Sequence, residues 1–483
     1  MFDKKIDEIT NKKCGPWELI NWVKKCKLPA VEVIQYKGWP CIELEDLWNA
    51  LHKSFNSAQE REVNTHFLDK IPDKPTIKWK LFFRNEIIDA IKKCNNSSAP
   101  GPDKLMWSHI KSIIRDKDCI GKFINIANAC IELGHWPTHF KTSTTVVIPK
   151  PNKAMFDSSK SYWPIILLNT IGKLVEKMIS KCLQFYTIFN NFIHPSQLRD
   201  LKLRSTIDAG VALTHIIHSG WAKSLTTSIL AFDIVQFFPS LNHQLLPLIL
   251  DKVELDQKIS MFFKNYLVGR KTKYLWNNFI SPFFNVNVGV SQGLALSSIL
   301  SALYLSPVFY SFDNHLKILK IPISIISFVD NGLFISQNKS ILHSNANLFC
   351  CYNIILSLLT KYGLVIEHRK TDIFHFSRSH GSFNPPPLDL SPLGGLVLLP
   401  KDIWKYLGFI FDCKLNFRNH INFYTNKAIS TIKCMKLLGN SLRGINLLQK
   451  RRLYRCCTLP ITLYCFPLWY YNKALTHYHL SIL

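Results

Sequence analysis

The sequence lacks the patterns that place a protein outside the cell or across a membrane. It begins MFDKKIDEIT, without the apolar segment of a secretory signal. Its longest apolar runs, such as residues 321–329, are shorter than the roughly 18 residues that a membrane span needs. The 14 cysteines include no Cys-x-x-Cys pair, so they indicate reduced thiols and no zinc finger. We therefore expect an intracellular protein of the nucleus or cytoplasm, with no membrane contact.

Acidic residues are also scarce. Thirty-three Asp and Glu face 59 Lys and Arg, a formal net charge of +26 at pH 7. A surplus of this size favours a polyanionic partner, with nucleic acid as the first candidate and an acidic membrane surface as the second. Hydrophobic residues make up 47% of the chain, so it can bury a large core and is not disordered.

Turn-forming residues divide the chain into units. The clearest breaks are at residues 95–103, 149–164 and 379–395, the last being the richest in Pro and Gly. Apolar residues recur at helical spacing in residues 45–63, which predicts an amphipathic helix. Residues 427–442 and 448–466 have the composition of basic helices, and a short β-branched run precedes residue 149.

Two acids lie in apolar, strand-like surroundings. Asp233 interrupts the run 228–243, and Asp330 separates two apolar runs just before Asn331-Gly332. A structural interpretation is available for each: a buried Asp paired with backbone donors or a lysine, and an Asn-Gly hairpin turn. The functional alternative is that the hairpin carries Asp330 to its tip, beside the strand end with Asp233. Two such carboxylates can hold divalent cations for nucleotidyl transfer, and their oxygen ligands favour Mg²⁺.

A third motif lies between these acids. Residues 289–293 read Gly-Val-Ser-Gln-Gly and follow a strand-like piece and precede an apolar helix, as in the nucleophile elbow of serine hydrolases. A hydrolase would need an acid and a base downstream; the candidates are Asp330 and one of His368, His375 and His380. The five-residue pattern is weakly specific, and a serine hydrolase has no use for the large positive charge.

The order of several segments carries a more specific signal. These segments are 97–111 (SSAPGPDKLMWSHIK), 146–179 (VVIPKPNK to GKLVEKMI), 194–213 (HPSQLRD to VAL), 231–243 (AFDIVQFFPSLNH), 289–307 (GVSQGLALSSILSALYLSP), 328–331 (FVDN), 367–379 (EHRKTDIFHFSRS) and 404–421 (WKYLGFIFDCKLNFRNHI). Together they resemble the reverse transcriptase of non-LTR (LINE-type) retrotransposons over nearly the whole chain.

The resemblance implies an α+β right-hand polymerase with an antiparallel palm sheet and mostly helical flanking segments. The expected division is a helical linker (1–95), fingers and the start of the reverse transcriptase domain (96–230), a palm with the catalytic motifs (231–378), and a primer grip with a partial thumb (379–483). No segment resembles the endonuclease or RNase H regions of such elements, so a truncated copy is expected. The implied activity is RNA-directed DNA synthesis with an RNA template, a DNA primer and deoxynucleoside triphosphates.

The resemblance also assigns roles to single residues. Asp233, Asp330 and the backbone carbonyl of Ile234 would bind the metal, Mg²⁺ or alternatively Mn²⁺, with Asn331 as a further catalytic position. Phe238 would exclude a ribose 2′-OH, although an aromatic residue in an apolar stretch is also ordinary core. The other expected nucleotide-binding residues are Gln292 and Gly293 beside the base pair, Lys150 and Lys153 toward the triphosphate or template, and Lys370 near the leaving phosphates.

Some residues depart from the family pattern. Asn331 stands where the family has a second Asp, and Trp163 where it has an Arg expected to hold the triphosphate; further departures are at Leu198, Arg199, Asp200, Ser291, Leu294 and Ser298. One close charge is worth about 4 kcal/mol at an effective dielectric near 20, equivalent to roughly a thousandfold in rate. We therefore expect the activity to be weakened or lost, as in a decayed copy. The alternative is a non-catalytic nucleic-acid-binding remnant of the same fold.

Overall fold

The computed structural model describes residues 34–36, 38–65, 78–150, 155–198, 204–252, 256–378, 384–436, 438 and 444–470. The strands are β1 (Gln35–Tyr36), β2 (Trp39–Pro40), β3 (Thr142–Pro149), β4 (Tyr162–Leu168), β5 (Thr226–Asp233), β6 (Arg270–Trp276), β7 (Phe279–Ile280), β8 (Phe284–Val286), β9 (Ile323–Phe328), β10 (Asn331–Asn338), β11 (Asp372–Phe376), β12 (Leu388–Asp389), β13 (Val397–Leu398), β14 (Ile403–Tyr406) and β15 (Phe409–Asp412). The α-helices are α3 (Leu44–Phe55), α4 (Arg84–Lys92), α5 (Trp107–Ile113), α6 (Lys117–Glu132), α7 (Thr170–Phe189), α8 (Thr206–Ala222), α9 (Phe237–Ser240), α10 (Leu245–Lys252), α11 (Gln257–Leu267), α12 (Ala295–Leu319), α13 (Ile341–Lys361), α14 (Arg418–Lys436), α15 (Leu447–Leu453), α16 (Leu459–Thr462) and α17 (Phe466–Trp469). The expected α+β class is confirmed.

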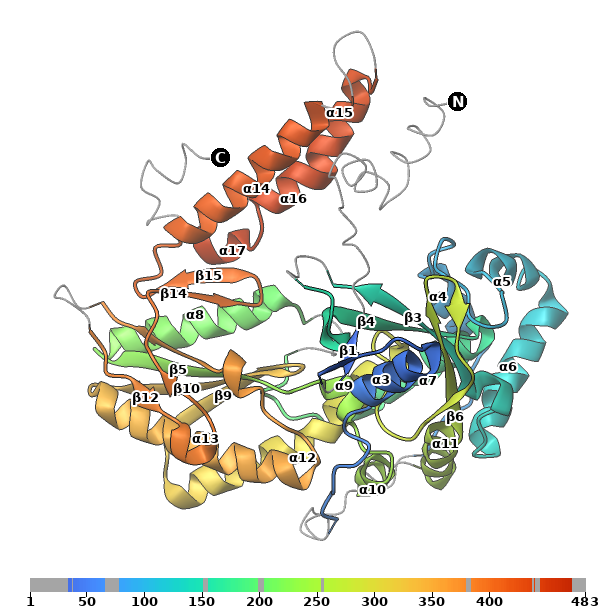
Figure 1. Ribbon diagram of the computed structural model, residues 1–483, viewed down its shortest axis with the longest axis horizontal. Coiled ribbons are helices and arrows are strands. Elements are labelled where there is room, and N and C mark those ends of the chain that lie inside the picture. Colours follow the sequence, from blue (N-terminus) through green and yellow to red (C-terminus); the bar gives the residue numbers. More distant parts are fainter. Residues whose placement is uncertain are drawn as a thin grey trace.

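A four-stranded antiparallel sheet, in the order β11-β5-β10-β9, lies at the centre of the fold. Successive side chains of a strand point to opposite faces, and both faces of this sheet are buried. Leu230, Phe232 and Phe334 belong to the core that includes α12 and α13, whereas Ile229 and Leu333 belong to the core that includes α8. Figure 1 shows α8 on one side of the sheet and α12 and α13 on the other. Burial on both faces fixes the register of β5 against β10.

A second sheet has the order β4-β3-β6-β7, with β8 paired to β6. Its β3 and β6 run parallel, and its other pairs are antiparallel. Helix α3 packs on this sheet through Trp48, Leu51 and Phe55, which share a buried cluster with Tyr274 and Trp276. Helix α3, in the N-terminal part of the described chain, therefore packs against this five-stranded sheet.

The last helices form a separate group. Figure 1 shows α14, α15 and α16 side by side, projecting away from the four-stranded sheet beyond β14 and β15. The helix expected at 448–466 is interrupted by a π-helical turn, Tyr454–Thr458, because Pro460 has no N–H for the regular bonding pattern. The basic helix expected at 427–442 begins earlier, at Arg418, and residues 437 and 439–442 lie outside the described part of the chain.

The helix expected at 45–63 is shorter than predicted, because α3 ends at Phe55. Asn56 is the reason: its side-chain amide donates to the carbonyl of His52 at 2.9 Å. Asparagine competes in this way with continuation of a helix. The residues after Asn56 leave the helix and run toward the four-stranded sheet, where Arg61 bonds to Gly363.

Two described helices, α12 and α13, are long and apolar enough to cross a membrane when only length and composition are considered. The sequence runs alone had suggested none. In α12 the most apolar window is 72% buried inside the fold, against 39% in α13. Core helices commonly have this composition, so the expected absence of membrane contact stays a prediction.

Candidate active site

Strand pairing brings the two candidate metal ligands together. Asn331 lies directly opposite Asp233 in the β5–β10 ladder, and the backbone N–H of Ile234 donates to the carbonyl of Asp330 at 2.9 Å. Residues Asp233 and Asp330 are 97 positions apart in the sequence, yet their backbones meet at one end of the sheet. The expected convergence of two acids therefore agrees with the fold.

The hairpin that carries Asp330 turns two positions earlier than the Asn-Gly pattern suggests. Its loop is Val329-Asp330, and Asn331 and Gly332 already belong to β10. Val329 adopts the left-handed φ of 62°. Gly332 is required for another reason: a Cβ there would lie 2.1 Å from the ring of Phe232. The glycine thus permits close packing of the two strands and leaves Asp330 at the tip.

The carboxylates are crowded and partly shielded from water. Asp233 is only 8% exposed. Burial, together with the charge of Asp233, raises the pKa of the Asp330 carboxyl above its ordinary value. The Asn331 amide donates to Asp330 Oδ1 at 2.8 Å, and the Lys370 ammonium forms an ion pair with Asp233. Each carboxylate therefore interacts with a donor side chain of the protein itself.

The electrostatic balance of Lys370 follows from this ion pair. Burial alone would lower the pKa of its ammonium, but the hydrogen bond and the charge of Asp233 outweigh burial and raise it. Lys370 ends a 3-10 turn, His368–Lys370, and one residue separates it from β11. The segment before this turn lies against β5, since Glu367 N–H donates to the Asp233 carbonyl at 2.8 Å. Lys370 is thus held beside the acids by backbone bonds.

The donor set suits a hard divalent cation. Burial, and after it the charge of Asp233, raises the pKa of the Asp330 carboxyl, and a bound cation offsets both the burial of charge and the repulsion between the carboxylates. Oxygen donors are the ligands that Mg²⁺ takes, together with water and phosphate. Among the described residues no group of three or more His, Cys, Asp or Glu side chains could hold a metal, so the protein itself offers two carboxylates.

The expected nucleotide-binding residues Phe238, Gln292 and Gly293 lie on two segments that contact each other. Phe238 is in α9 and its carbonyl accepts a hydrogen bond from Val290 N–H at 2.9 Å. Gly289 has φ +79°, and a Cβ there would lie 2.6 Å from Pro239. The loop before α12 is thereby fixed against α9. Gln292 and Gly293 are exposed at the end of this loop.

The ring of Phe238 is half-buried and packs against the core, with its centroid 5.8 Å from that of Phe237. Ordinary packing therefore accounts for part of its environment.

The β3–β4 hairpin and its loop contain three positions that the resemblance assigns to the triphosphate region, Lys150, Lys153 and Trp163. Lys150 directly follows β3, where its backbone N–H donates to Ser161 at 2.8 Å and its ammonium to the carbonyl of Lys160 at 2.7 Å. Lys153 lies outside the described residues. Trp163 is opposite Ile148 in the hairpin and is 44% exposed. The contacts given for Lys150 are with the loop between β3 and β4, and no described contact joins Trp163 to the carboxylates.

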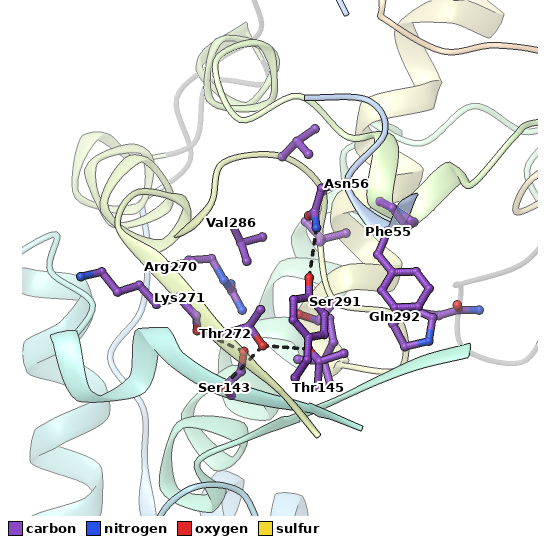
Figure 2. Close-up of a pocket in the computed structure, with 17 residues that line it drawn as sticks. Phe55, Asn56, Ser143, Thr145, Arg270, Lys271, Thr272, Val286, Ser291 and Gln292 are labelled. Atoms are coloured by element: carbon purple, nitrogen blue, oxygen red, sulfur yellow. Dashed lines mark hydrogen bonds between the residues drawn. The ribbon is translucent and has the colours of Figure 1, made fainter. Parts of the chain in front are cut away.

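A pocket separates the five-stranded sheet from the loop before α12. Figure 2 shows Arg270, Thr272 and Gln292 among the side chains around it. Pro164 of β4 and Pro239 of α9 also line it. Gln292 therefore faces a hollow bounded by the hairpin that carries Trp163 and by α9.

Several residues of this region were missed by sequence reasoning. Glu176 in α7 is fully buried and accepts a hydrogen bond from the Tyr266 hydroxyl at 2.7 Å. Arg270 lies over the Tyr266 ring, 4.8 Å from its centroid. The signal was present: Glu176 shares a helical stripe with apolar Ile179 and Leu183, and an acid in such a stripe needs a partner.

The contacts given for the candidate bases of a hydrolase do not support that alternative. His368 Nδ1 is 2.7 Å from the Tyr352 hydroxyl, and His375 Nδ1 is 2.8 Å from the Ser228 hydroxyl. Neither contact involves Ser291, and His380 lies outside the described residues. Asp330 belongs to the carboxylate pair instead.

These features are those of a polymerase palm, and comparison with known proteins identifies the family. Residues 148–411 match the family described as reverse transcriptase (RNA-dependent DNA polymerase). The match covers more than half of the chain, so the protein belongs to the reverse transcriptase family. The family expected from the ordered motifs, a LINE-type reverse transcriptase, is confirmed.

Curated relatives agree with this assignment. The chain is 24% identical over 398 residues to the probable RNA-directed DNA polymerase from transposon BS of Drosophila melanogaster, covering 80% of this chain and 42% of that protein. It is 22% identical over 397 residues to the RNA-directed DNA polymerase from mobile element jockey of Drosophila funebris, covering 81% and 42%. The chain thus spans about two fifths of the length of these relatives. A solved structure, apo telomerase from Candida tropicalis truncated from its C-terminal domain, aligns with 57% of this chain and 54% of that chain at 14% identity and a TM-score of 0.39.

Proposed function

We propose that this chain is the polymerase core of a non-LTR retrotransposon protein and that its reaction is RNA-templated DNA synthesis. The observation that carries the proposal is the pairing of β5 with β10, which places Asp233 and Asp330 at one sheet end within the family match. The proposed substrates are an RNA template, a DNA primer and deoxynucleoside triphosphates. The formal charge of +26 suits such polyanions.

Asp233, Asp330 and the Ile234 carbonyl are the proposed ligands of two Mg²⁺ ions, with Mn²⁺ as the alternative. When bound, divalent cations neutralise phosphate charge and favour ionisation of an attacking hydroxyl. The chain's own part is to hold the two carboxylates at the hairpin tip and to keep Lys370 beside them. Lys370 would pass from Asp233 to the leaving phosphates when the nucleotide arrives.

The nucleotide is proposed to lie against α9 and the loop before α12. Phe238 would stand beneath the sugar and exclude a ribose 2′-OH by its bulk. Gln292 and Gly293, both exposed, would line the base pair, and Lys150 and Lys153 would approach the triphosphate. The pocket beside Gln292 supports this arrangement because it lies between α9 and the hairpin of β3 and β4.

The proposed activity is weak or absent in the chain as it stands. Asn331 supplies an amide where the resemblance expects a carboxylate, and it donates to Asp330. Trp163 supplies no charge for a triphosphate. The domain division at 95, 230 and 378 and an intracellular location remain part of the same proposal.

Primer extension on an RNA template tests the proposal. We expect little extension from the unaltered chain, and a gain after Asn331→Asp combined with Trp163→Arg. Asp233→Asn in that background should abolish the gain and serves as the control for a contaminating polymerase. Full extension by the unaltered chain would contradict the loss of activity, and no gain in the double variant would contradict the site assignment.

A non-catalytic nucleic-acid binder is the second candidate, favoured by the internal donors on both carboxylates. It predicts binding of template–primer that weakens with salt, by about 0.9 in log K per phosphate contact and decade of salt. It also predicts no Mg²⁺-dependent extension even in the double variant. The two candidates therefore separate in one experiment.

A further inference from the structure

The end of α3 and the residues that follow it contact the candidate site, and the proposed function gives them no role. We call Ser54–Asn64 the strap. At one end the Ser54 hydroxyl accepts a hydrogen bond from the Ser159 hydroxyl at 2.8 Å, in the loop between β3 and β4. At the other end Asn64 N–H donates to the carbonyl of Lys361 at 3.0 Å. The strap therefore spans from the five-stranded sheet to the last turn of α13.

Its first contact in between is with Gln236, the N-cap residue directly before α9. Gln236 has a left-handed φ of 46°, a conformation that is unfavourable for a residue other than Gly, Asn or Asp. The Ser57 hydroxyl donates to Gln236 Oε1 at 2.8 Å, and Gln236 Nε2 donates to the Ser54 carbonyl at 3.2 Å. Both polar atoms of the Gln236 amide are thus bonded to the strap, which stabilises the strained start of α9.

The second contact is made by Arg61 of the strap, whose side chain joins two segments of the site. The guanidinium of Arg61 donates to the Ser240 hydroxyl at 3.2 Å and to the Gly363 carbonyl at 3.0 Å. Ser240 ends α9, and its hydroxyl donates in turn to the Val235 carbonyl at 3.2 Å. Gly363 begins the segment that runs beside β5, where Val235 N–H donates to Val365 at 2.8 Å. One arginine therefore bridges the segment after Asp233 and the segment that leads to Lys370.

A third observation fits the same arrangement. Gly363 has φ +68°, and a Cβ there would lie 3.1 Å from a methyl group of Val63. The backbone at Gly363 therefore approaches the strap closely. Both ends of the four-residue helix α9 are held by side chains from the strap, and α9 has only one turn of its own to resist displacement.

We propose that Arg61 and Ser57 are positioning residues for Phe238, so that the strap sets the discrimination between deoxy- and ribonucleotides. The proposal rests on the proposed function, because Phe238 must face the sugar for its position to matter. If α9 shifts, the ring moves relative to the 2′ position, and a fit decided by steric contact is sensitive to shifts well below 1 Å.

Nucleotide binding without turnover tests this inference. The full chain is bound to an RNA template with a DNA primer that ends in a dideoxynucleotide, and the dissociation constants of dATP and ATP are measured by titration opposite a template uridine. Their ratio is the readout, because a general loss of affinity changes both constants together. We expect Arg61→Ala to reduce the preference for dATP about tenfold, Arg61→Lys to restore part of it, and Ser57→Ala to reduce it by a smaller factor.

Two controls separate positioning from other effects. Arg84→Ala removes the same charge from an exposed side chain of α4 and should leave the ratio unchanged. Phe238→Ala should remove the preference, and adding Arg61→Ala to it should change the ratio no further. Circular dichroism and melting temperature identify any variant that fails to fold, and Ser57→Ala then carries the test since Ser57 is exposed.

The outcomes are distinguishable. If the unaltered chain prefers dATP and Phe238→Ala removes the preference, while Arg61→Ala and Ser57→Ala do not change it, the strap inference is wrong and the proposed function stands. If Phe238→Ala has no effect or the chain binds neither nucleotide, the proposed function fails and the strap inference fails with it. If Arg61→Ala lowers the ratio equally with and without Phe238, the strap does not act through Phe238.

Discussion

Replacement of Asn331 by Asp gives a test of the cation site that needs no enzymatic activity. In the structure the Asn331 amide donates to Asp330 Oδ1 at 2.8 Å. The substitution turns this donor into a third carboxylate at the end of the β5–β10 ladder. The folded state should therefore lose stability when no cation is present and regain it when a divalent cation binds.

The magnitude follows from two terms. A hydrogen bond to a charged group contributes about 1.5–3 kcal/mol. Two like charges about 4 Å apart repel by about 4 kcal/mol at an effective dielectric near 20, and the half-buried position of Asn331 reduces this by solvent screening. We expect Asn331→Asp to lower the free energy of unfolding by about 2–4 kcal/mol in EDTA. A cation at 100 times its dissociation constant should return about 2.7 kcal/mol.

The assay is urea unfolding at pH 8 in EDTA and in rising Mg²⁺, with the unaltered chain in parallel. Asn338→Asp is the matched control, since Asn338 ends the same strand and its Oδ1 accepts from Ser340 N–H at 3.1 Å, a role that an aspartate keeps. We expect this control to change stability by at most about 0.5 kcal/mol. If Asn331→Asp is as stable as the control in EDTA and gains no more from Mg²⁺, the carboxylates do not form a cation site.

Three further predictions concern the same sheet. Gly332→Ala should destabilise the fold by roughly 1–3 kcal/mol through overpacking, because its Cβ would lie 2.1 Å from the Phe232 ring. Adding Phe232→Leu should recover part of this loss in urea unfolding, and an unchanged midpoint for Gly332→Ala would refute the predicted steric clash. Asp330→Asn should stabilise the metal-free protein at pH 7, because the pKa of the Asp330 carboxyl is raised in the folded state, so that its ionisation above about pH 3.8 opposes folding. The gain in unfolding free energy should vanish below that pH, and a gain that persists there would point to another cause. Burial lowers the pKa of His375 to about 4, below the roughly 6.5 of the unfolded state, so the free energy of unfolding should fall by up to about 3 kcal/mol as the pH is lowered from 6.5 to 4. His375→Gln, whose amide can still bond Ser228, should flatten this pH dependence, and an unchanged profile would exclude His375 as its source.

Much of the architecture could be predicted because it depends on local patterns. The apolar run before Asp233 forms β5, and the two runs around Asp330 form β9 and β10. The apolar stretch after Gly293 forms α12. In each case a continuous apolar run bounded by turn residues or polar residues marks the element, and the ordered motifs supplied the family.

The prediction was less accurate where a side chain competes with the backbone. The Asn-Gly pair suggested the wrong turn residues, because Gly332 is needed for the approach of Phe232 and not for the turn. Residues 45–63 were expected to be one helix, but Asn56 bonds to the helix end and stops it. Such outcomes depend on contacts that a pattern of apolar and polar residues does not contain.

The sequence by itself determined the family and the α+β class and selected Asp233 and Asp330 as the candidate acids, because these depend on composition and on motifs that are contiguous in the chain. Only the tertiary structure decided that Lys370 pairs with Asp233 and that Arg61 bridges Ser240 and Gly363. These contacts join residues that are 137, 179 and 302 positions apart. Their geometry is fixed by the packing of whole sheets and helices, which no local segment specifies.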